Sequence, residues 1–213
     1  MKFWSNSFHD GAVIPGEYAF CVIDPLAHVT LSSNKNPHLA WSDLPPGTGS
    51  LALVCHDPDV PSRGEDVNQE GRTVPADLPR VDFFHWVLVD LPPQLAGIEA
   101  GACSNGVTPR GKPGPGIADP ALAPARHGIN DYTGWFAGDP DMAGDYHGYD
   151  GPCPPWNDAI AHRYVFTLYA LDLARLPVEG KFTGADVRAA MAGHVLAQAQ
   201  WSGSYTLNPV LSK

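Results

Sequence analysis

The stretch YDGPCPPWNDAIAHRYVFTLYALD, residues 149–172, changes character in its middle. Up to Asp158 it consists mainly of turn-forming residues and contains three prolines, whereas from His162 onward it is an almost unbroken apolar run. Proline fixes φ and favours an extended backbone in the residue before it. A short apolar run bounded by turn residues is typical of a buried strand. The stretch therefore predicts a rigid proline corner that leads into a buried strand over residues 164–171, with His162 at its entrance.

Two further apolar runs predict inner strands. The segment GSLALVCHDPDVP has an apolar run over residues 51–55 that stops at an acidic, proline-flanked turn. The segment VDFFHWVLVDLPP is apolar at both parities over residues 81–91, a pattern typical of strands buried on both faces. A shorter alternating segment, GSYTLNPV, follows near the C-terminus at residues 203–210. These runs predict a β-rich fold, either a sandwich or a sheet covered by helices.

One segment has the pattern of a helix, over residues 185–200. Thr183 with Asp186 three residues later is a variant of the capping box that begins many helices. An apolar stripe with helical spacing follows, formed by Val187, Met191, His194, Val195 and Gln198. Such a stripe usually packs on a sheet, so we expect a docking helix without a chemical role.

The length of 213 residues favours a single domain over residues 1–213, because β-sandwiches and barrels of this size commonly stay undivided. Two long polar loops interrupt the strands at about residues 62–80 and 104–147. Loops of this length in a compact domain are usually functional or mobile.

The charge balance narrows the range of partners. The chain has 13 Lys and Arg residues against 23 Asp and Glu residues, a formal net charge of -10. Such a charge repels phosphate backbones and anionic lipid surfaces, so we expect no nucleic-acid partner. No apolar run approaches the ~20 residues that span a bilayer, and the N-terminal sequence lacks the apolar core of a signal peptide. We therefore expect a soluble, cytoplasmic protein without stable membrane insertion.

The four cysteines, Cys21, Cys55, Cys103 and Cys153, are far apart in the sequence and form no C-x-x-C pair. Since disulfides are rare in the cytosol, we expect mostly buried free thiols, although the sequence does not determine whether any of them pair. The nine histidines include no pair with metal-ligand spacing on an identifiable element, so we predict neither a metal nor a cofactor.

The histidines at the strands are the first candidate site residues. Side chains two apart on a strand share a face, so His162 and Tyr164 should project together while Arg163 points the other way. By the same alternation, His85 should share a face with Phe83 and with the apolar residues that follow it, Val87 and Val89. A buried imidazole needs a hydrogen-bond partner, and we expect a nearby carboxylate to provide it.

The acidic turn supplies two such carboxylates, Asp57 and Asp59. Pro58 and Pro61 restrict the backbone around them, so both acids are positioned at little further cost in entropy. They could bond an imidazole, cap backbone N–H groups or bind a cation, and ordinary turn chemistry is the commonest role of Asp beside Pro.

Taken together, three segments resemble the phosphatidylethanolamine-binding protein family, in particular its bacterial and archaeal branch of Raf-kinase-inhibitor-like proteins. They are NPHLAWSDLPPGTGSLALVCHDPDVP, FFHWVLVDLPP and GYDGPCPPWNDAIAHRYVFTLYALD. The resemblance implies a mainly β fold in which a large antiparallel sheet packs on a smaller sheet, with one or two docked helices near the C-terminus.

The resemblance also implies a small pocket for phosphate-like or phospholipid-headgroup-like anions. Its expected ligand-binding residues are Asp57, Asp59, His85, Tyr149, Pro155, His162 and Tyr164. The loop at residues 62–80 separates the acidic turn from His85 by more than in the simplest family members, and the region at 104–147 is enlarged. Phe83 stands where eukaryotic relatives have an aromatic residue, often Trp, so membrane or kinase roles of eukaryotic members transfer poorly.

Three functions are compatible with these residues. The first is a protein that binds a small anionic ligand and could inhibit or scaffold a kinase or a protease. The second is a hydrolase or lyase that uses His85, His162 and an aspartate as acid and base. The third is an interaction protein whose long loops make the contacts. Because the pocket lacks an evident activated nucleophile, we favour binding, predict no catalytic residue, and leave the oligomeric state open.

Overall fold

The structure is a computed structural model that describes residues 1–212. The strands are β1 (Lys2–Trp4), β2 (Cys21–Asp24), β3 (His28–Leu31), β4 (Leu39–Ser42), β5 (Ser50–Pro61), β6 (Arg80–Leu91), β7 (Gly97–Ile98), β8 (Arg126–His127), β9 (His162–Leu171) and β10 (Val195–Tyr205). The helices are α1 (Tyr132–Trp135) and α2 (Gly184–Ala190), and the short 3-10 turns are η1 (Gly16–Tyr18) and η2 (Pro120–Leu122).

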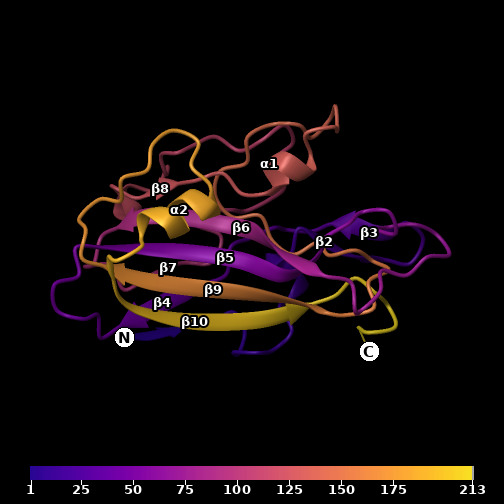
Figure 1. The fold of residues 1–213 in the computed structure, drawn as a ribbon, viewed down its shortest axis with the longest axis horizontal. Coiled ribbons are helices and arrows are strands. Elements are labelled where there is room, and N and C mark those ends of the chain that lie inside the picture. Colours follow the sequence, from indigo (N-terminus) through magenta and orange to yellow (C-terminus); the bar gives the residue numbers. More distant parts are fainter. Residues whose placement is uncertain (213) are drawn as a thin grey trace.

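A five-stranded antiparallel sheet in the order β10-β9-β5-β6-β8 forms the centre of the fold. A three-stranded sheet in the order β1-β4-β7 and a hairpin of β2 and β3 accompany it. Figure 1 shows the long strands of the large sheet side by side, with α2 in front of them. The predicted mainly β fold with a large and a smaller antiparallel sheet is confirmed.

Two apolar clusters cover the two faces of the large sheet. One joins Trp86 and Phe166 of the large sheet to Leu39 and Trp41 of the smaller sheet. The other lies under α2 and is formed by Val54, Phe84, Val87, Val187 and Met191, among others. Full burial of each such aliphatic or aromatic side chain contributes roughly 1.5–3 kcal/mol. From Phe84 to Leu91 the strand is therefore buried on both faces, as its double apolar parity predicts. The prediction is wrong for Val81 and Asp82, which are exposed.

Strand β5 is longer than predicted. It continues through the acidic segment to Pro61, so the DPDVP stretch is part of a strand and not a turn after it. The pairing of β5 with β6 shifts register between Asp57 and Val60. This irregularity accommodates Pro58, which cannot donate to a regular ladder.

The predicted helix over residues 185–200 is wrong in its second half. The capping box at Thr183 and Asp186 is present, but α2 ends at Ala190. Gly193 then takes a positive φ of 82°, a conformation that commonly follows a helix end. The remainder forms β10, which pairs with β9 from Val195 to Tyr205. Pairing along a whole neighbouring strand outweighs a moderate helical periodicity, because β-structure depends on context.

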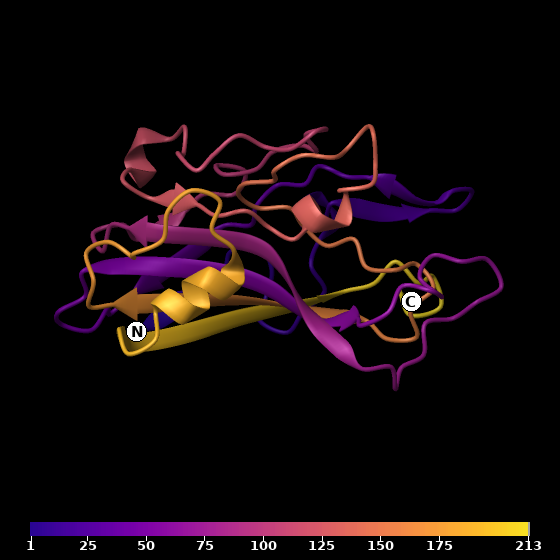
Figure 2. The ribbon, with the colours of Figure 1, turned by 45° about the horizontal axis from the view of Figure 1, so that its top comes forward.

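The two long loops are structured in different ways. The segment 104–147 contains η2, β8 and α1, and Figure 2 shows it as a layer over the large sheet. Its buried Leu122 and Tyr132 belong to the cluster that contains Trp86. The segment 62–80 is tied to the proline corner, because the Asn157 side-chain amide donates to the carbonyls of Asp66, Gln69 and Arg72 at 2.8, 3.3 and 3.1 Å. Within residues 1–212, no helix combines the length and apolar character that crossing a bilayer requires.

Candidate functional site

A cavity of about 450 Å³, here called the main cavity, brings together most of the predicted site residues. Asp57 from β5, His85 from β6, Pro155 from the proline corner, and His162 and Tyr164 from β9 all line it. Segments that are far apart in the sequence therefore meet around one cavity.

His162 is fully buried between two carboxylates. Its Nδ1 lies 2.7 Å from Asp57 Oδ2 and its Nε2 lies 3.0 Å from Asp158 Oδ2. Burial alone would lower the pKa of His162, but its hydrogen bonds to Asp158 and Asp57 outweigh burial and raise the pKa to about 9. The ring is therefore an imidazolium at neutral pH, and both of its N–H groups are already used.

Arg80 completes this charge network. Its guanidinium donates to both oxygens of Asp158, at 2.6 and 3.0 Å. Burial opposes ionisation of Asp158, but the hydrogen bonds from His162 and Arg80 prevail and lower the pKa of its carboxyl. Two carboxylates thus face two cations, so the network is neutral overall and holds the proline corner against β6 and β9.

His85 reaches the main cavity because of a β-bulge. Cys55 pairs with Trp86 while the next residue, His56, pairs with Phe84, so His85 is the extra residue of β6. A bulge redirects side chains, and here the alternation reverses after it. His85 therefore shares the cavity with Phe83, while Val87 lies in the cluster under α2, as does Val89. The predicted common face with these two valines is wrong.

The hydrogen-bond partner of His85 is a backbone carbonyl and not the expected carboxylate. Its Nδ1 donates to the carbonyl of Asp150 at 2.7 Å. Burial lowers the pKa of His85, and the nearby charge of Asp57 offsets this only in part. The ring is therefore neutral at neutral pH, with Nε2 unprotonated. Within residues 1–212 this Nε2 has no hydrogen-bond partner, which leaves it available to a molecule in the main cavity.

The Tyr164 hydroxyl is the second available polar group. It is buried, and no atom of residues 1–212 meets the distance and angle of a hydrogen bond with it, although the Asp57 carboxylate lies close enough to interact with it. Burial, with the negative charge of Asp57 beside it, raises the pKa of Tyr164 well above the ordinary value. The group therefore remains an O–H donor. Its ring lies edge-on to that of His85, with the centroids 5.1 Å apart.

Two predicted site residues point elsewhere. Asp59 directs its carboxylate to the guanidinium of Arg163, with both oxygens at 2.8 Å. Tyr149 is buried behind the main cavity, and its hydroxyl donates to the carbonyl of Tyr18 at 2.6 Å. These two residues support the walls, whereas the other five face the main cavity.

Most of the remaining lining is apolar and comes partly from the long loops. Val67 belongs to the segment 62–80, and Trp135, Phe136 and Met142 belong to the segment 104–147. Phe83 packs edge-on against Tyr132 with the ring centroids 5.3 Å apart. The main cavity therefore has a small polar end and a larger apolar remainder.

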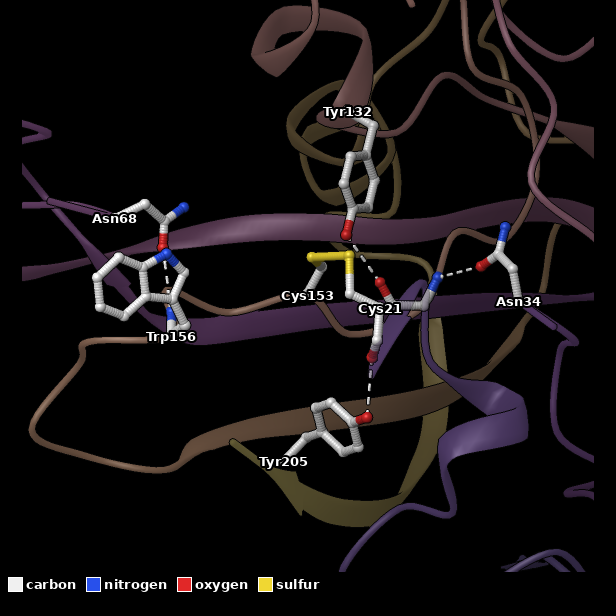
Figure 3. The surroundings of a disulfide bond; sticks show 8 residues. Cys21, Asn34, Asn68, Tyr132, Cys153, Trp156 and Tyr205 are labelled. Atoms are coloured by element: carbon white, nitrogen blue, oxygen red, sulfur yellow. Dashed lines mark hydrogen bonds between the residues drawn. A yellow bond between two sulfur atoms is a disulfide. The ribbon is translucent and has the colours of Figure 1, made fainter. Parts of the chain in front are cut away.

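Cys21 and Cys153 form a disulfide bond that also lines the main cavity. This corrects the expectation of free thiols, which holds only for Cys55 and Cys103. Figure 3 shows the bond and the hydrogen bonds around it. The cause is tertiary: the backbone N–H groups of Phe20 and Cys21 donate to the carbonyl of Pro152 at 2.9 and 3.2 Å, which brings the two cysteine Cα atoms to 5.0 Å.

Sequence reasoning missed three polar residues of the site, Asp158, Arg80 and Asp150. Asp158 stands four residues before His162, a weak signal that the corner supplies a second acid. Arg80 immediately precedes the predicted strand over 81–91. The role of Asp150 has no sequence signal, because it acts on His85 through its backbone carbonyl.

A large antiparallel sheet packed on a smaller one, with a buried histidine–aspartate network beside an apolar cavity, defines a class of β-rich pocket proteins. Within that class, the family model described as phosphatidylethanolamine-binding protein matches residues 4–206. The chain belongs to this family.

Known relatives align with nearly the whole length of this chain. A UPF0098 protein of Methanothermobacter thermautotrophicus is 32% identical over 205 residues, which cover 96% of this chain and 98% of the relative. The crystal structure of the phosphatidylethanolamine-binding protein homologue CT736 from Chlamydia trachomatis has 27% identity and a TM-score of 0.61, and the match covers 95% of each chain. The structure of Escherichia coli YbcL, at 24% identity and a TM-score of 0.66, covers 96% of this chain and 97% of its own, and supports the fold.

Proposed function

We propose that the protein binds a small organic anion in the main cavity and that it is not an enzyme. The observation that carries this proposal is the Tyr164 hydroxyl, a buried donor without a partner in residues 1–212 that faces the cavity. A buried polar group without a partner costs about 1–3 kcal/mol. A ligand oxygen that accepts from this hydroxyl removes that cost.

The ligand's polar end would lie between Tyr164 and His85. The hydroxyl donates to a ligand oxygen, and the unprotonated Nε2 of His85 accepts from a protonated phosphate or from an amine or hydroxyl group. Arg63 lines the same cavity and is exposed, so its guanidinium supplies a cation for the negative charge. These partners suit a phosphate-like or headgroup-like anion.

The rest of the ligand would be apolar. The side chains of Phe83, Trp135, Phe136 and Met142 offer an extended apolar wall. Burial of apolar ligand surface contributes roughly 25 cal/mol per Å². We therefore propose an amphipathic ligand, with its anionic group against Tyr164 and its apolar part against the long loops.

The His162 geometry removes one of the two histidines that the alternative of a hydrolase or lyase would use, and it leaves His85, with its unprotonated Nε2, as the candidate base. A general base must have a free lone pair within reach of the proton it removes. Both ring nitrogens of His162 donate to carboxylates, so this residue has no such lone pair. It acts instead as the buried cation that fixes Asp57 and Asp158.

A kinase or protease target and a cytoplasmic location stay predictions from the sequence. The disulfide between Cys21 and Cys153 bears on the second of these. Such bonds persist in oxidising compartments and are rare in the cytosol, so fractionation of cells that express the protein is the direct test.

The test of the proposed function is a titration followed by NMR, with inorganic phosphate, phosphoethanolamine and phenyl phosphate as probes. We expect shifts centred on His85 and Tyr164, with phenyl phosphate bound most tightly because it fills the apolar wall. Tyr164→Phe removes only the hydroxyl, and loss of a hydrogen bond to a charged group should raise Kd about tenfold or more.

Tyr169→Phe is the matched control, since Tyr169 lies on the other face of β9 against the cluster under α2. It should bind like the wild type. Equal Kd values for Tyr164→Phe and wild type, or the absence of shifts at His85 and Tyr164 with all three probes, would show that the main cavity is not the binding site.

A further inference from the structure

A second cavity of about 350 Å³ lies within the segment 101–118 and is separate from the main cavity in its lining residues. We call it the loop cavity. This segment and the side chains of His127 and His147 line it.

The loop cavity differs from the rest of the molecule in charge. Three basic side chains line it, Lys112, His127 and His147, and among residues 1–212 no acidic side chain does so. The chain as a whole has 23 acidic residues against 13 Lys and Arg residues. The lining therefore offers donor groups to a ligand and contains no carboxylate from the described residues that would repel an anion.

His127 provides the observation that points to a ligand. It is 5% exposed, and its Nε2 has no hydrogen-bond partner in the described chain. Burial, with the positive charge of Lys112 nearby, lowers the pKa of His127 to about 3, so the ring is neutral. The tautomer with its proton on Nε2 is a donor, and an oxyanion in the cavity would be its acceptor.

The other two basic residues are held in place by the protein. The Lys112 ammonium donates to Ser104 Oγ at 3.0 Å, to the carbonyl of Tyr149, and to Asp150 Oδ1 at 2.9 Å. His147 donates from Nδ1 to the carbonyl of Lys112 at 3.1 Å, because a carbonyl can only accept. The Lys112 ammonium is thus fixed and paired with the Asp150 carboxylate, while His127 is left to bind a ligand directly.

We propose that the loop cavity is a second binding site that takes a small hydrophilic oxyanion, a carboxylate or a phosphate, with His127 Nε2 as the direct donor. Asn105 and Thr108 also line the loop cavity and supply amide and hydroxyl groups for the hydroxyls of such a ligand. The polar lining distinguishes it from the main cavity, whose apolar walls suit an amphipathic ligand. The inference does not depend on the proposed function.

The test is NMR of the imidazole nitrogens in the full-length protein, titrated with inorganic phosphate and, separately, with malonate. Binding should shift the signals of His127 and His147 and raise the pKa of His127, since a nearby anion favours the charged ring. His127→Leu should raise Kd about tenfold or more, and His127→Gln, which retains a donor, should recover part of the affinity. Tyr164→Phe should leave the shifts at His127 and His147 unchanged.

The outcomes separate the two sites. Shifts confined to His85 would support the main cavity and overturn the second site. Absence of shifts at His127 up to tens of millimolar of both probes would also overturn it, and would leave a water molecule as the partner of Nε2. If His127→Leu does not fold, His127→Gln and the pKa of His127 in the wild type test the proposal instead. An unchanged pKa of His127 at saturating probe concentration rejects it.

Discussion

His162 in the main cavity and His127 in the loop cavity are equally removed from solvent, at 0% and 5% exposure, yet their protonation differs completely. His162 lies between two carboxylates, and its pKa rises to about 9. His127 lies near Lys112 and without an acid beside it, and its pKa falls to about 3. Burial disfavours the charged form in both cases, so the partners decide the sign. The main cavity therefore contains a buried cation, His162, whereas the loop cavity contains a buried neutral ring, His127.

The largest effect should come from removing the buried cation. His162→Leu leaves Asp57 without its charged partner, while Arg80 still neutralises Asp158. Removing one partner of a buried charge pair costs about 3–5 kcal/mol. We expect the free energy of unfolding, measured by urea denaturation, to fall by this amount.

His127→Leu is the matched change in the other cavity. Because the imidazole has no partner in residues 1–212, an apolar replacement removes an unmet polar group and should change stability by less than about 1 kcal/mol. A loss as large as that of His162→Leu would mean that both rings are held by strong partners, which contradicts the comparison.

The cysteines extend the comparison, because the main cavity carries the Cys21–Cys153 bond and the loop cavity carries the free thiol of Cys103. Replacing both Cys21 and Cys153 by serine should lower the free energy of unfolding by about 2–5 kcal/mol, since the bond closes a long loop. A reducing agent should have the same effect on the wild type.

Cys103→Ala serves as the control for the thiol, and reduction should destabilise it as much as it destabilises the wild type. Burial raises the pKa of Cys103 to about 12, so alkylation at neutral pH should be slow. An unfolding midpoint that does not respond to reductant would rule out the disulfide.

The next effect concerns pH. The pKa of His162 is raised from 6.5 to about 9 in the folded protein. Its contribution is therefore fully present below about pH 6.5 and is lost as the pH rises through about 9, a total of about 3 kcal/mol. Urea denaturation across this window should show the loss in the wild type and a flatter profile in His162→Gln. NMR should find His162 titrating near its raised value and His127 still neutral at about pH 5.

The smallest effect should come from an ion pair outside both cavities. Arg163 pairs with Asp59, but its side chain is 65% exposed. The Asp59 side chain is 11% exposed, but the backbone N–H of residue 163 still donates to its Oδ2 at 2.9 Å in Arg163→Ala. Because solvent screens the exposed guanidinium, this variant should lose about 1 kcal/mol of stability. Phosphate titrations should give the same Kd with this variant, and a weaker affinity would place Asp59 closer to the ligand than its contact with Arg163 implies.

Local sequence signals predicted the inner strands, the capping box at Thr183, and the shared face of His162 and Tyr164, because each depends on neighbours in the chain. The resemblance of the three segments to a known family predicted that Asp57 and His85 meet these residues. The bulge at His85 could not be predicted, since it depends on the register between β5 and β6. The helix at residues 185–200 was misassigned for the same reason, because pairing with β9 decides its second half.

The charge network around His162 could not be predicted from the sequence for a further reason. Arg80 and Asp158 are 78 positions apart, and the two cysteines of the disulfide are 132 positions apart. Contacts at such separation arise from packing of the corner on the sheet and leave no local pattern.

The disulfide also has a topological consequence. The ring that it closes runs from Cys21 to Cys153, and it contains both long loops, 62–80 and 104–147. A protease that cuts either loop opens the ring without releasing a fragment, because the two ends remain covalently joined through the sulfur atoms. A nicked molecule would therefore keep its full mass on a non-reducing gel and separate into two pieces only when reduced.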